Sequence, residues 1–236
     1  MAESHKRKAK KDDFLMQGAI LAAAGVITKI IGVVYRIPLT NILGDEGIGF
    51  YGYAFEVYAM ALVLSSLSLP TAVSKLVSAR MAMKQRKNAF RVFTCSLIFA
   101  IVVGTLFALI IFFGADAFST HLMKSPLSAF ALKVLAPGLF IVSILGVLRG
   151  YFQGLGTMVP TAVSQIIEQI VNAVVSILGA VFLFKVGTRA AEKQNNELLG
   201  PAYGAAGATV GTIVGALFAL LFLIFAFFVY KDVIKR

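Results

Sequence analysis

The sequence holds 236 residues, of which 59% are hydrophobic and 14% charged, and its formal net charge is +11. A soluble domain is about 45–50% apolar and about 25% charged, and disordered chains are poor in apolar residues, so both classes are excluded. The single cysteine, Cys95, excludes an internal disulfide, and there is no Cys/His cluster that would hold zinc. The basic residues lie between apolar runs, which argues against a nucleic-acid partner. The composition therefore predicts an integral membrane protein.

Six apolar segments are long enough to cross a bilayer, because a hydrocarbon core of ~30 Å needs ~20 helical residues. In lipid the backbone must satisfy its own hydrogen bonds, so uninterrupted runs of this length indicate helices. The predicted spans are Phe14–Tyr35, Ile48–Leu69, Val92–Phe113, Ser128–Leu148, Val159–Phe184 and Gly207–Tyr230. The expected fold class is an all-α membrane protein, with a basic segment at residues 1–13 followed by a six-helix transmembrane bundle at residues 14–236.

The distribution of Lys and Arg predicts the orientation of this bundle. Fifteen of these residues fall at 1–13, 70–91, 149–158 and 231–236, whereas the opposite loops, 36–47, 114–127 and 185–206, hold five. An excess of Lys and Arg marks the cytoplasmic side, so we expect both termini there. The basic N-terminal segment also suits an anionic leaflet.

The first span carries small and basic residues on one helical face. Their spacing alternates between four and three, which places them on a single stripe: Gly18, Ala22, Gly25, Lys29, Gly32 and Arg36. Small residues there would let another helix approach closely. Long basic side chains near helix ends reach back to the interface, and we favour this interpretation for Arg36. For Lys29, ~22 Å beyond the start of the span, snorkelling and a cavity position both stay open.

The second span contains a buried acid, Glu56, for which two interpretations stand. It could form a salt bridge with Lys29 or Arg36 across neighbouring helices, or it could titrate and couple protons. The span also holds three tyrosines that are expected in an interfacial aromatic belt: Tyr51, Tyr53 and Tyr58.

The fifth span carries a polar stripe formed by Gln165, Glu168, Gln169, Asn172 and Ser176. Glu168 lies ~14 Å into the span, near the midplane. An ionised carboxylate there costs ~2.5–3.5 kcal/mol unless it is paired or hydrated, so it should face a partner or a water-filled cavity. The alternative is a hydrogen-bonded network that merely joins helices. We favour a cavity lining, because four adjacent polar side chains exceed what joining helices requires.

The remaining features of the sequence are the glycines of the sixth span and the lack of catalytic or phosphate-binding motifs. Gly204, Gly207, Gly211 and Gly215 form one edge of the sixth span and predict close helix packing. The stretch RGYFQG, residues 149–154, is interpreted as a helix end whose dipole favours a cation. No nucleophile–base arrangement and no phosphate-binding GxxxxGK[ST] loop occurs in the sequence. We therefore expect no enzyme activity and no cofactor.

Three stretches give the sequence a family resemblance: IGVVYRIPLTNILGDEGIGFY, LSLPTAVSKLVSAR and LRGYFQGLGTMVPTAVSQIIEQ. Together they resemble the polysaccharide-export flippases, most of all the stage V sporulation protein B type, which are relatives of the lipid II flippases. These proteins belong to the multidrug/oligosaccharidyl-lipid/polysaccharide superfamily. The resemblance runs from about Phe14 to Tyr230.

This resemblance implies a carrier in the bacterial inner membrane. Such carriers move undecaprenyl-pyrophosphate-linked sugars for peptidoglycan, spore cortex or polysaccharide between leaflets by alternating access, with two helical lobes around a central cavity. Lys29 falls where lipid II flippases have a cavity arginine, and Arg36 lies one residue beyond their second such cation. Their helix-two arginine has no counterpart in residues 63–67. The candidate substrate-binding residues are Lys29, Arg36, Glu56, Gln165, Glu168, Gln169 and Asn172.

The six predicted spans amount to one lobe, and alternating access needs a second unit. The expected partners are therefore the bilayer, a lipid-linked saccharide, a coupling ion, and a second lobe that is a missing half or a dimer partner. Two other functions stay open: a cation-coupled multidrug exporter of the same superfamily, and a non-transporting membrane scaffold.

Overall fold

The computed structural model describes the backbone of residues 2–66 and 68–235, and the side chains of residues 15–66 and 68–230. This part of the chain is helical and contains no strand. Its elements are α1 (Ala2–Ser65), α2 (Leu69–Ala82), α3 (Arg86–Ala117), a π-helical turn η1 (Phe118–Leu122), a 3₁₀ turn η2 (Pro126–Ser128), α4 (Ala129–Gly154), α5 (Val159–Gln194) and α6 (Leu199–Lys235). The predicted all-α bundle is confirmed.

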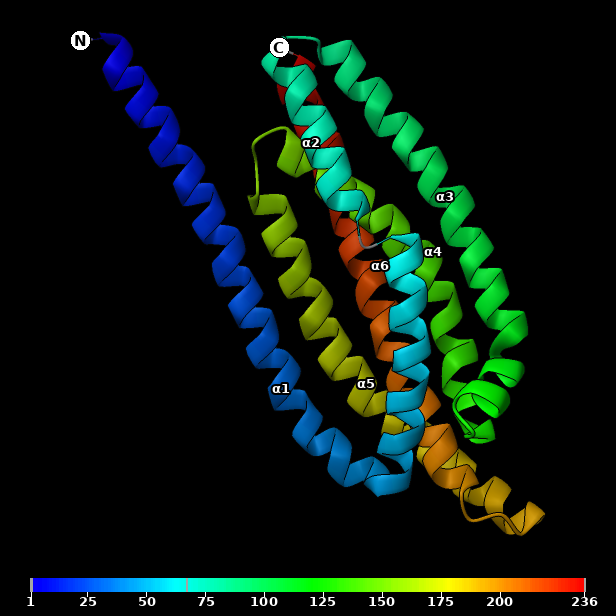
Figure 1. Cartoon of the computed structure of the whole chain (residues 1–236). Coiled ribbons are helices and arrows are strands. Elements are labelled where there is room, and N and C mark those ends of the chain that lie inside the picture. Colours follow the sequence, from blue (N-terminus) through cyan, green and yellow to red (C-terminus); the bar gives the residue numbers. More distant parts are fainter. Residues whose placement is uncertain (1, 67, 236) are drawn as a thin grey trace.

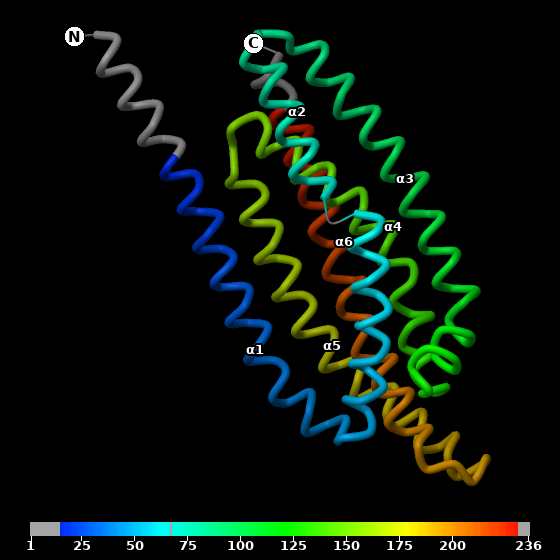
Figure 2. The backbone as a smooth tube through the Cα atoms, viewed as in Figure 1, coloured from blue at the N-terminus to red at the C-terminus, as the bar shows by residue number. Residues whose placement is uncertain are grey.

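Helix α1 consists of two arms that meet at Gly44. This residue has φ 65° and ψ −178°, a backbone region that is essentially restricted to glycine. The chain reverses direction there, so the first arm (residues 2–43) and the second arm (residues 45–65) run in opposite directions (Figure 1). The first arm lies alongside α5 (Figure 2). The backbone of residues 2–13, predicted as a separate basic segment, continues the first arm.

By length and apolarity, five helical stretches of the described chain can cross a membrane: Leu15–Ala82, Arg86–Leu122, Pro126–Gly154, Val159–Gln194 and Leu199–Tyr230. The first of these is 68 residues long and contains the reversal at Gly44, so it supplies two passes. The six predicted spans therefore correspond to six passes of the chain, and both ends lie at the same end of the bundle (Figure 1).

The second pass is interrupted, contrary to the predicted continuous span Ile48–Leu69. The second arm of α1 ends at Ser65, and α2 begins at Leu69 with Pro70 in its first turn. Proline has no backbone N–H to donate and is favoured in the first turn of a helix, so Pro70 marks the start of α2. The residues after Pro70 were predicted as a basic loop, but α2 carries them as helix to Ala82.

Buried serines surround this interruption. The Ser66 hydroxyl lies 2.8 Å from the Ser65 hydroxyl and 2.6 Å from the Ser143 hydroxyl of α4. Ser143 in turn donates a hydrogen bond of 2.7 Å to the Leu139 carbonyl. Within lipid, a break in a helix is tolerated only where the backbone groups stay paired. Here the Ser66 N–H donates to the Leu62 carbonyl at 2.9 Å, and the Leu69 N–H donates to the Ser66 carbonyl at 3.1 Å.

Glycines allow α5 and α6 to pack backbone against backbone. A Cβ at Gly207 would collide with the carbonyl oxygen of Gly179, and one at Gly215 would lie 2.5 Å from the Glu168 carbonyl. A Cβ at Gly211 would collide with the Ser176 side chain. The predicted packing role of the glycine edge on the sixth span is confirmed.

The same device joins α2 to α4. A Cβ at Gly150 would lie 2.5 Å from the carbonyl oxygen of Pro70, and one at Gly154 would lie 2.7 Å from the Val77 Cβ. The two glycines of the RGYFQG stretch therefore serve helix packing, a role that the dipole interpretation of this stretch missed.

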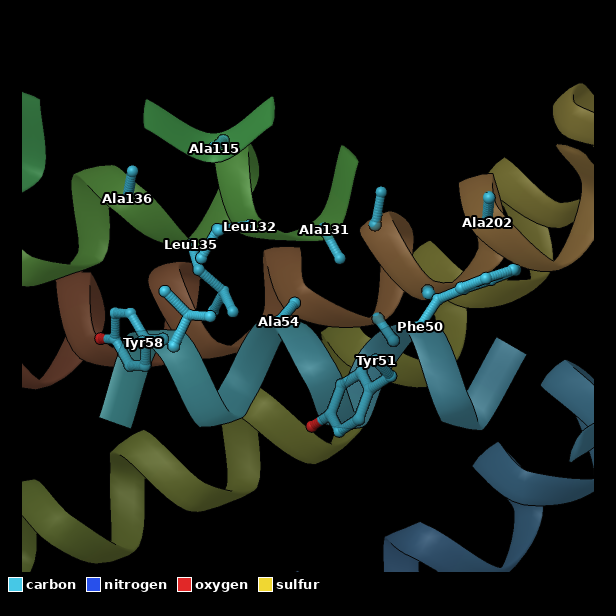
Figure 3. Packing of buried hydrophobic residues seen from close by; sticks show 14 of the residues in the cluster. Phe50, Tyr51, Ala54, Tyr58, Ala115, Ala131, Leu132, Leu135, Ala136 and Ala202 are labelled. Carbon is cyan, nitrogen blue, oxygen red and sulfur yellow. The ribbon is translucent and has the colours of Figure 1, made fainter. Parts of the chain in front are cut away.

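Two apolar cores form within the bundle. One includes Tyr58, Leu132 and Leu135 and is shown in Figure 3, and the other includes Phe93 and Phe152. On three of the passes the boundary between them falls at small or polar residues: Ser65 and Ser66, Gly104, and Gly211 and Thr212. Small and polar residues thus lie between the two cores on these passes.

We expect Gly207→Ala to lower the thermal unfolding temperature of the purified chain in detergent. The added methyl forces α5 and α6 apart, and overpacking of this kind costs about 1–3 kcal/mol. The matched control is Gly25→Ala, where nothing lies within 4 Å of the added Cβ. The control should unfold at or above the wild-type temperature, because alanine is the better helix former. Equal melting of Gly207→Ala and wild type would contradict the packing role.

Candidate functional site

The small and basic stripe of the first arm is open rather than packed. No atom lies within 4 Å of a Cβ built at Gly18 or Gly25, and the Lys29 and Arg36 side chains are exposed. Gly32 is the point of contact, since a Cβ there would lie 3.2 Å from Nε2 of Gln169 on α5. Apart from this contact at Gly32, the close helix packing expected along the stripe is not found in the described part of the chain.

An open pocket of about 520 Å³ lies between the two arms of α1. Arg36 and Thr40 line it from the first arm, and Tyr51, Phe55 and Glu56 line it from the second. A cation, an anion and two aromatic rings thus border one space, which combines a mostly apolar wall with a few polar groups, as in small-molecule sites.

Neither open cation of the first arm has an acidic partner. Among the described residues, Lys29, Arg36 and Glu56 form no ion pair within 4 Å. Glu56 is exposed, so the salt bridge considered for it is not made, although it shares the pocket with Arg36. A lysine in an apolar helix without an acid needs water or an anionic ligand.

The predicted polar stripe of α5 divides among three neighbours. Glu168 faces α4, where its Oε2 lies 2.6 Å from Nη2 of Arg149. Gln169 lies next to Gly32 of the first arm, and Asn172 faces α6. Gln165 is half-buried, as are Glu168 and Gln169.

The α6 side of the stripe is a hydrogen-bonded network. Asn172 is 8% exposed, and its Oδ1 accepts hydrogen bonds from Ser176 at 2.9 Å and from Thr212 of α6 at 3.5 Å. Its Nδ2 donates to Oε1 of Gln169 at 3.2 Å. At Asn172 the geometry favours helix joining, the alternative to a cavity lining, whereas Gln165, Glu168 and Gln169 keep partly open surfaces.

Arg149 was expected only as a cation favoured by the dipole at a helix end, and its role as the partner of Glu168 was not predicted. Its Nε donates to the Ser164 hydroxyl at 3.0 Å, and its carbonyl oxygen accepts from the Thr161 hydroxyl at 3.4 Å. The sequence did carry a signal for this pairing. A polar face of α5 is formed at helical spacing by Thr161, Ser164 and Glu168, and such a face suits a neighbouring cation. Arg149 is therefore the partner that the carboxylate of Glu168 was expected to need within the membrane.

The predicted aromatic belt is wrong for two of its three tyrosines. Tyr51 and Tyr58 are buried at 7% and 3% exposure, and only Tyr53 is exposed. The Tyr51 hydroxyl lies 3.5 Å from that of Tyr35, and the Tyr58 ring packs edge-on to Phe55. Both rings belong to the core shown in Figure 3, because they lie on the face of the second arm that packs against the bundle.

Comparison with protein families assigns this chain to one of them. A model of the polysaccharide biosynthesis protein family matches residues 14–236. The chain belongs to this family. It is 33% identical over 226 residues to stage V sporulation protein B of Bacillus subtilis, and 28% identical over 178 residues to the lipid II flippase MurJ of the same organism. The resemblance predicted from the sequence is confirmed.

The family members are longer than this chain. The alignments cover 95% of the chain but 41% of stage V sporulation protein B, and 72% of the chain but 32% of the lipid II flippase. The chain thus spans about two fifths of the first of these relatives, the length expected for one lobe.

Solved structures share the fold. A multidrug resistance MATE family transporter of the MOP superfamily, in an outward-facing conformation, matches with a TM-score of 0.76 at 19% identity, over 94% of this chain and 46% of that one. A MOP superfamily transporter from Pyrococcus furiosus matches with a TM-score of 0.72 at 20% identity, over 91% and 45%. The helices described here therefore form a multi-pass lobe of the MOP superfamily fold.

Cysteine labelling tests whether the stripe of the first arm is wet. With Cys95 replaced, we expect Lys29→Cys to react with a membrane-impermeant thiol reagent in vesicles, because its side chain borders the open face. The matched control is Ile30→Cys, which is also exposed but lies among apolar neighbours and should be covered by lipid. Equal protection of both positions would contradict a water-accessible face and favour the scaffold alternative.

Proposed function

We propose that this chain is a lobe of a membrane flippase that moves a polyprenyl-pyrophosphate-linked saccharide across the bacterial inner membrane. The observation that carries the proposal is the open face of α1, where Lys29 and Arg36 are exposed and have no acidic partner among the described residues. Family membership and the relationship to the lipid II flippase support it.

The charge of this face selects the ligand class. A cation inside the apolar layer costs about 2.5–3.5 kcal/mol on insertion scales, and a bound anion offsets that cost. A diphosphate offers several oxygens and a charge that one lysine and one arginine can share. The pocket beside Arg36, with its two aromatic rings and Glu56, would then receive the sugar next to the diphosphate.

Transport requires more than this lobe. Alternating access is a rocking of one helical unit against another, so the proposal includes a second lobe that covers the open face of α1. In this arrangement both termini are cytoplasmic, as the Lys and Arg distribution predicts. Glu56 and Glu168 remain the candidates for coupling an ion.

We expect Lys29→Ala to weaken binding of geranylgeranyl diphosphate to the purified chain in detergent. Loss of one cation–phosphate contact should raise the Kd by about tenfold, equivalent to about 1.4 kcal/mol. The matched control is Lys133→Ala, because Nζ of Lys133 is already held by Asp116 at 2.8 Å. Geranylgeraniol, which lacks the phosphates, should bind wild type and Lys29→Ala alike.

Two results would contradict this function. Equal affinity of Lys29→Ala and Lys133→Ala for the diphosphate would remove Lys29 from the site. Binding of a cationic dye such as rhodamine 6G that is lost in Glu168→Gln, without diphosphate binding, would favour the cation-coupled exporter.

A further inference from the structure

The Arg149 side chain follows α5 toward the middle of the bundle. Its carbonyl oxygen is level with Thr161, its Nε with Ser164 and its Nη2 with Glu168. These three α5 residues lie at successively greater distances from the helix start at Val159, over ~10 Å along the axis. The guanidinium is therefore deeper in the bundle than its own backbone.

This direction is the opposite of snorkelling. A basic residue close to a helix end ordinarily turns its charge outward to the interface. Arg149 lies near the end of α4 at Gly154, yet its charge is turned inward. A cation held inward needs compensation, which Glu168 and Ser164 supply.

Helix packing does not require this pair. α4 and α5 touch each other little, and each is fixed separately to α6 through extensive contacts. The Arg149–Glu168 contact bridges the space between two helices that a third already holds. It therefore contributes less to assembly than an ion pair between two directly packed helices would.

Within the described part of the chain, the pair also leaves one donor and one acceptor without a hydrogen-bond partner. Arg149 and Glu168 share one contact, Nη2 to Oε2, rather than a two-pronged one. Among the described residues, Nη1 of Arg149 and Oε1 of Glu168 have no hydrogen-bond partner, and neither is sealed from solvent. The side chains keep 15% and 26% exposure. A guanidinium has five N–H donors, so this one can engage a further anion.

The charged groups of Arg149 and Lys29 lie at a similar height along the bundle axis. The first arm and α5 run in the same direction, since Oε1 of Gln17 accepts from the Met158 N–H at 2.9 Å and Gly32 lies against Gln169. Lys29 precedes Gly32 by three residues, ~4.5 Å along the axis. It is thus within about one turn of Glu168 and its bound guanidinium.

We propose that Arg149 is a second phosphate-binding cation of this lobe, and that Glu168 occupies its guanidinium until a lipid diphosphate replaces the carboxylate. The proposal rests on the proposed function and adds a residue to the same site. Guanidinium binds phosphate and carboxylate through the same fork, so the two anions compete for it directly.

Exchange of this kind accounts for two features of the pair: its side chains are half-buried rather than sealed, and they share a single contact. A bound carboxylate keeps the cation neutralised when no ligand is present, which lowers the cost of an unliganded charge in the apolar layer. It also lowers affinity, because the incoming diphosphate must displace it. A carrier benefits from both effects, since it must release what it binds.

The test is a double-mutant comparison of diphosphate binding by the purified chain in detergent. We expect Glu168→Gln to bind geranylgeranyl diphosphate about tenfold more tightly than wild type and Arg149→Gln about tenfold more weakly. The double variant should behave as Arg149→Gln, because the carboxylate acts only through the guanidinium. Inorganic pyrophosphate serves as a competitor. If the phosphates alone are recognised, its affinities for the variants should follow the same order as those of the prenylated probe. If only the prenylated probe shows this order, the lipid chain is part of what is recognised.

The control variant is Asp116→Asn, which breaks the other ion pair of the described residues, with Lys133, and should leave the affinity unchanged. A merely structural pair would lower the unfolding temperature in Glu168→Gln and Arg149→Gln and leave both affinities at the wild-type value, which would overturn the proposal. If Lys29→Ala weakens binding while the Arg149 variants do not, only this inference fails. If wild type binds neither probe, the proposed function fails with it.

Discussion

The lobe depends on the close approach of helix backbones where no Cβ intervenes. Lipid removes the hydrophobic driving force between helices, so contact area must hold them together, and glycine maximises it. At Gly207 against Gly179, and at Gly150 against Pro70, any side chain would occupy the space of a neighbouring backbone. These contacts fix α5 on α6 and α2 on α4, and so set the positions from which Glu168 and Arg149 meet.

Much of the fold was predictable, because apolar length and the backbone's need for internal hydrogen bonds leave few structures in lipid. The passes, the glycine edge of α6 and the family all followed from the residues. The interruption before Pro70 did not, since the apolar run continues through the break as far as Leu69. Proline after a pair of serines was the available signal, and the backbone hydrogen bonds that continue across the break, from Ser66 to Leu62 and from Leu69 to Ser66, show why it is tolerated.

The candidate site was predictable in its residue types but not in its pairings. The depth of Glu168 in the membrane required a partner, but the sequence offered three possible cations: Lys29, Arg36 and Arg149. The choice depends on which helices are neighbours, and helical spacing carries no information about that. The aromatic-belt prediction failed for the same reason. One face of the second arm packs against the rest of the lobe, and Tyr51 and Tyr58 lie on that face, so they contact protein rather than the membrane interface.

The interrupted second pass changes which parts of the lobe belong together. α2 follows α1 in sequence through a short non-helical link, but Gly150 and Gly154 clamp it to α4. Mechanically, α2, the second half of that pass, belongs with α4, and the non-helical link separates it from the second arm of α1. A tilt of α1 would then be absorbed at the link instead of being transmitted along one rigid rod, leaving the end of the bundle that carries Arg149 undisturbed.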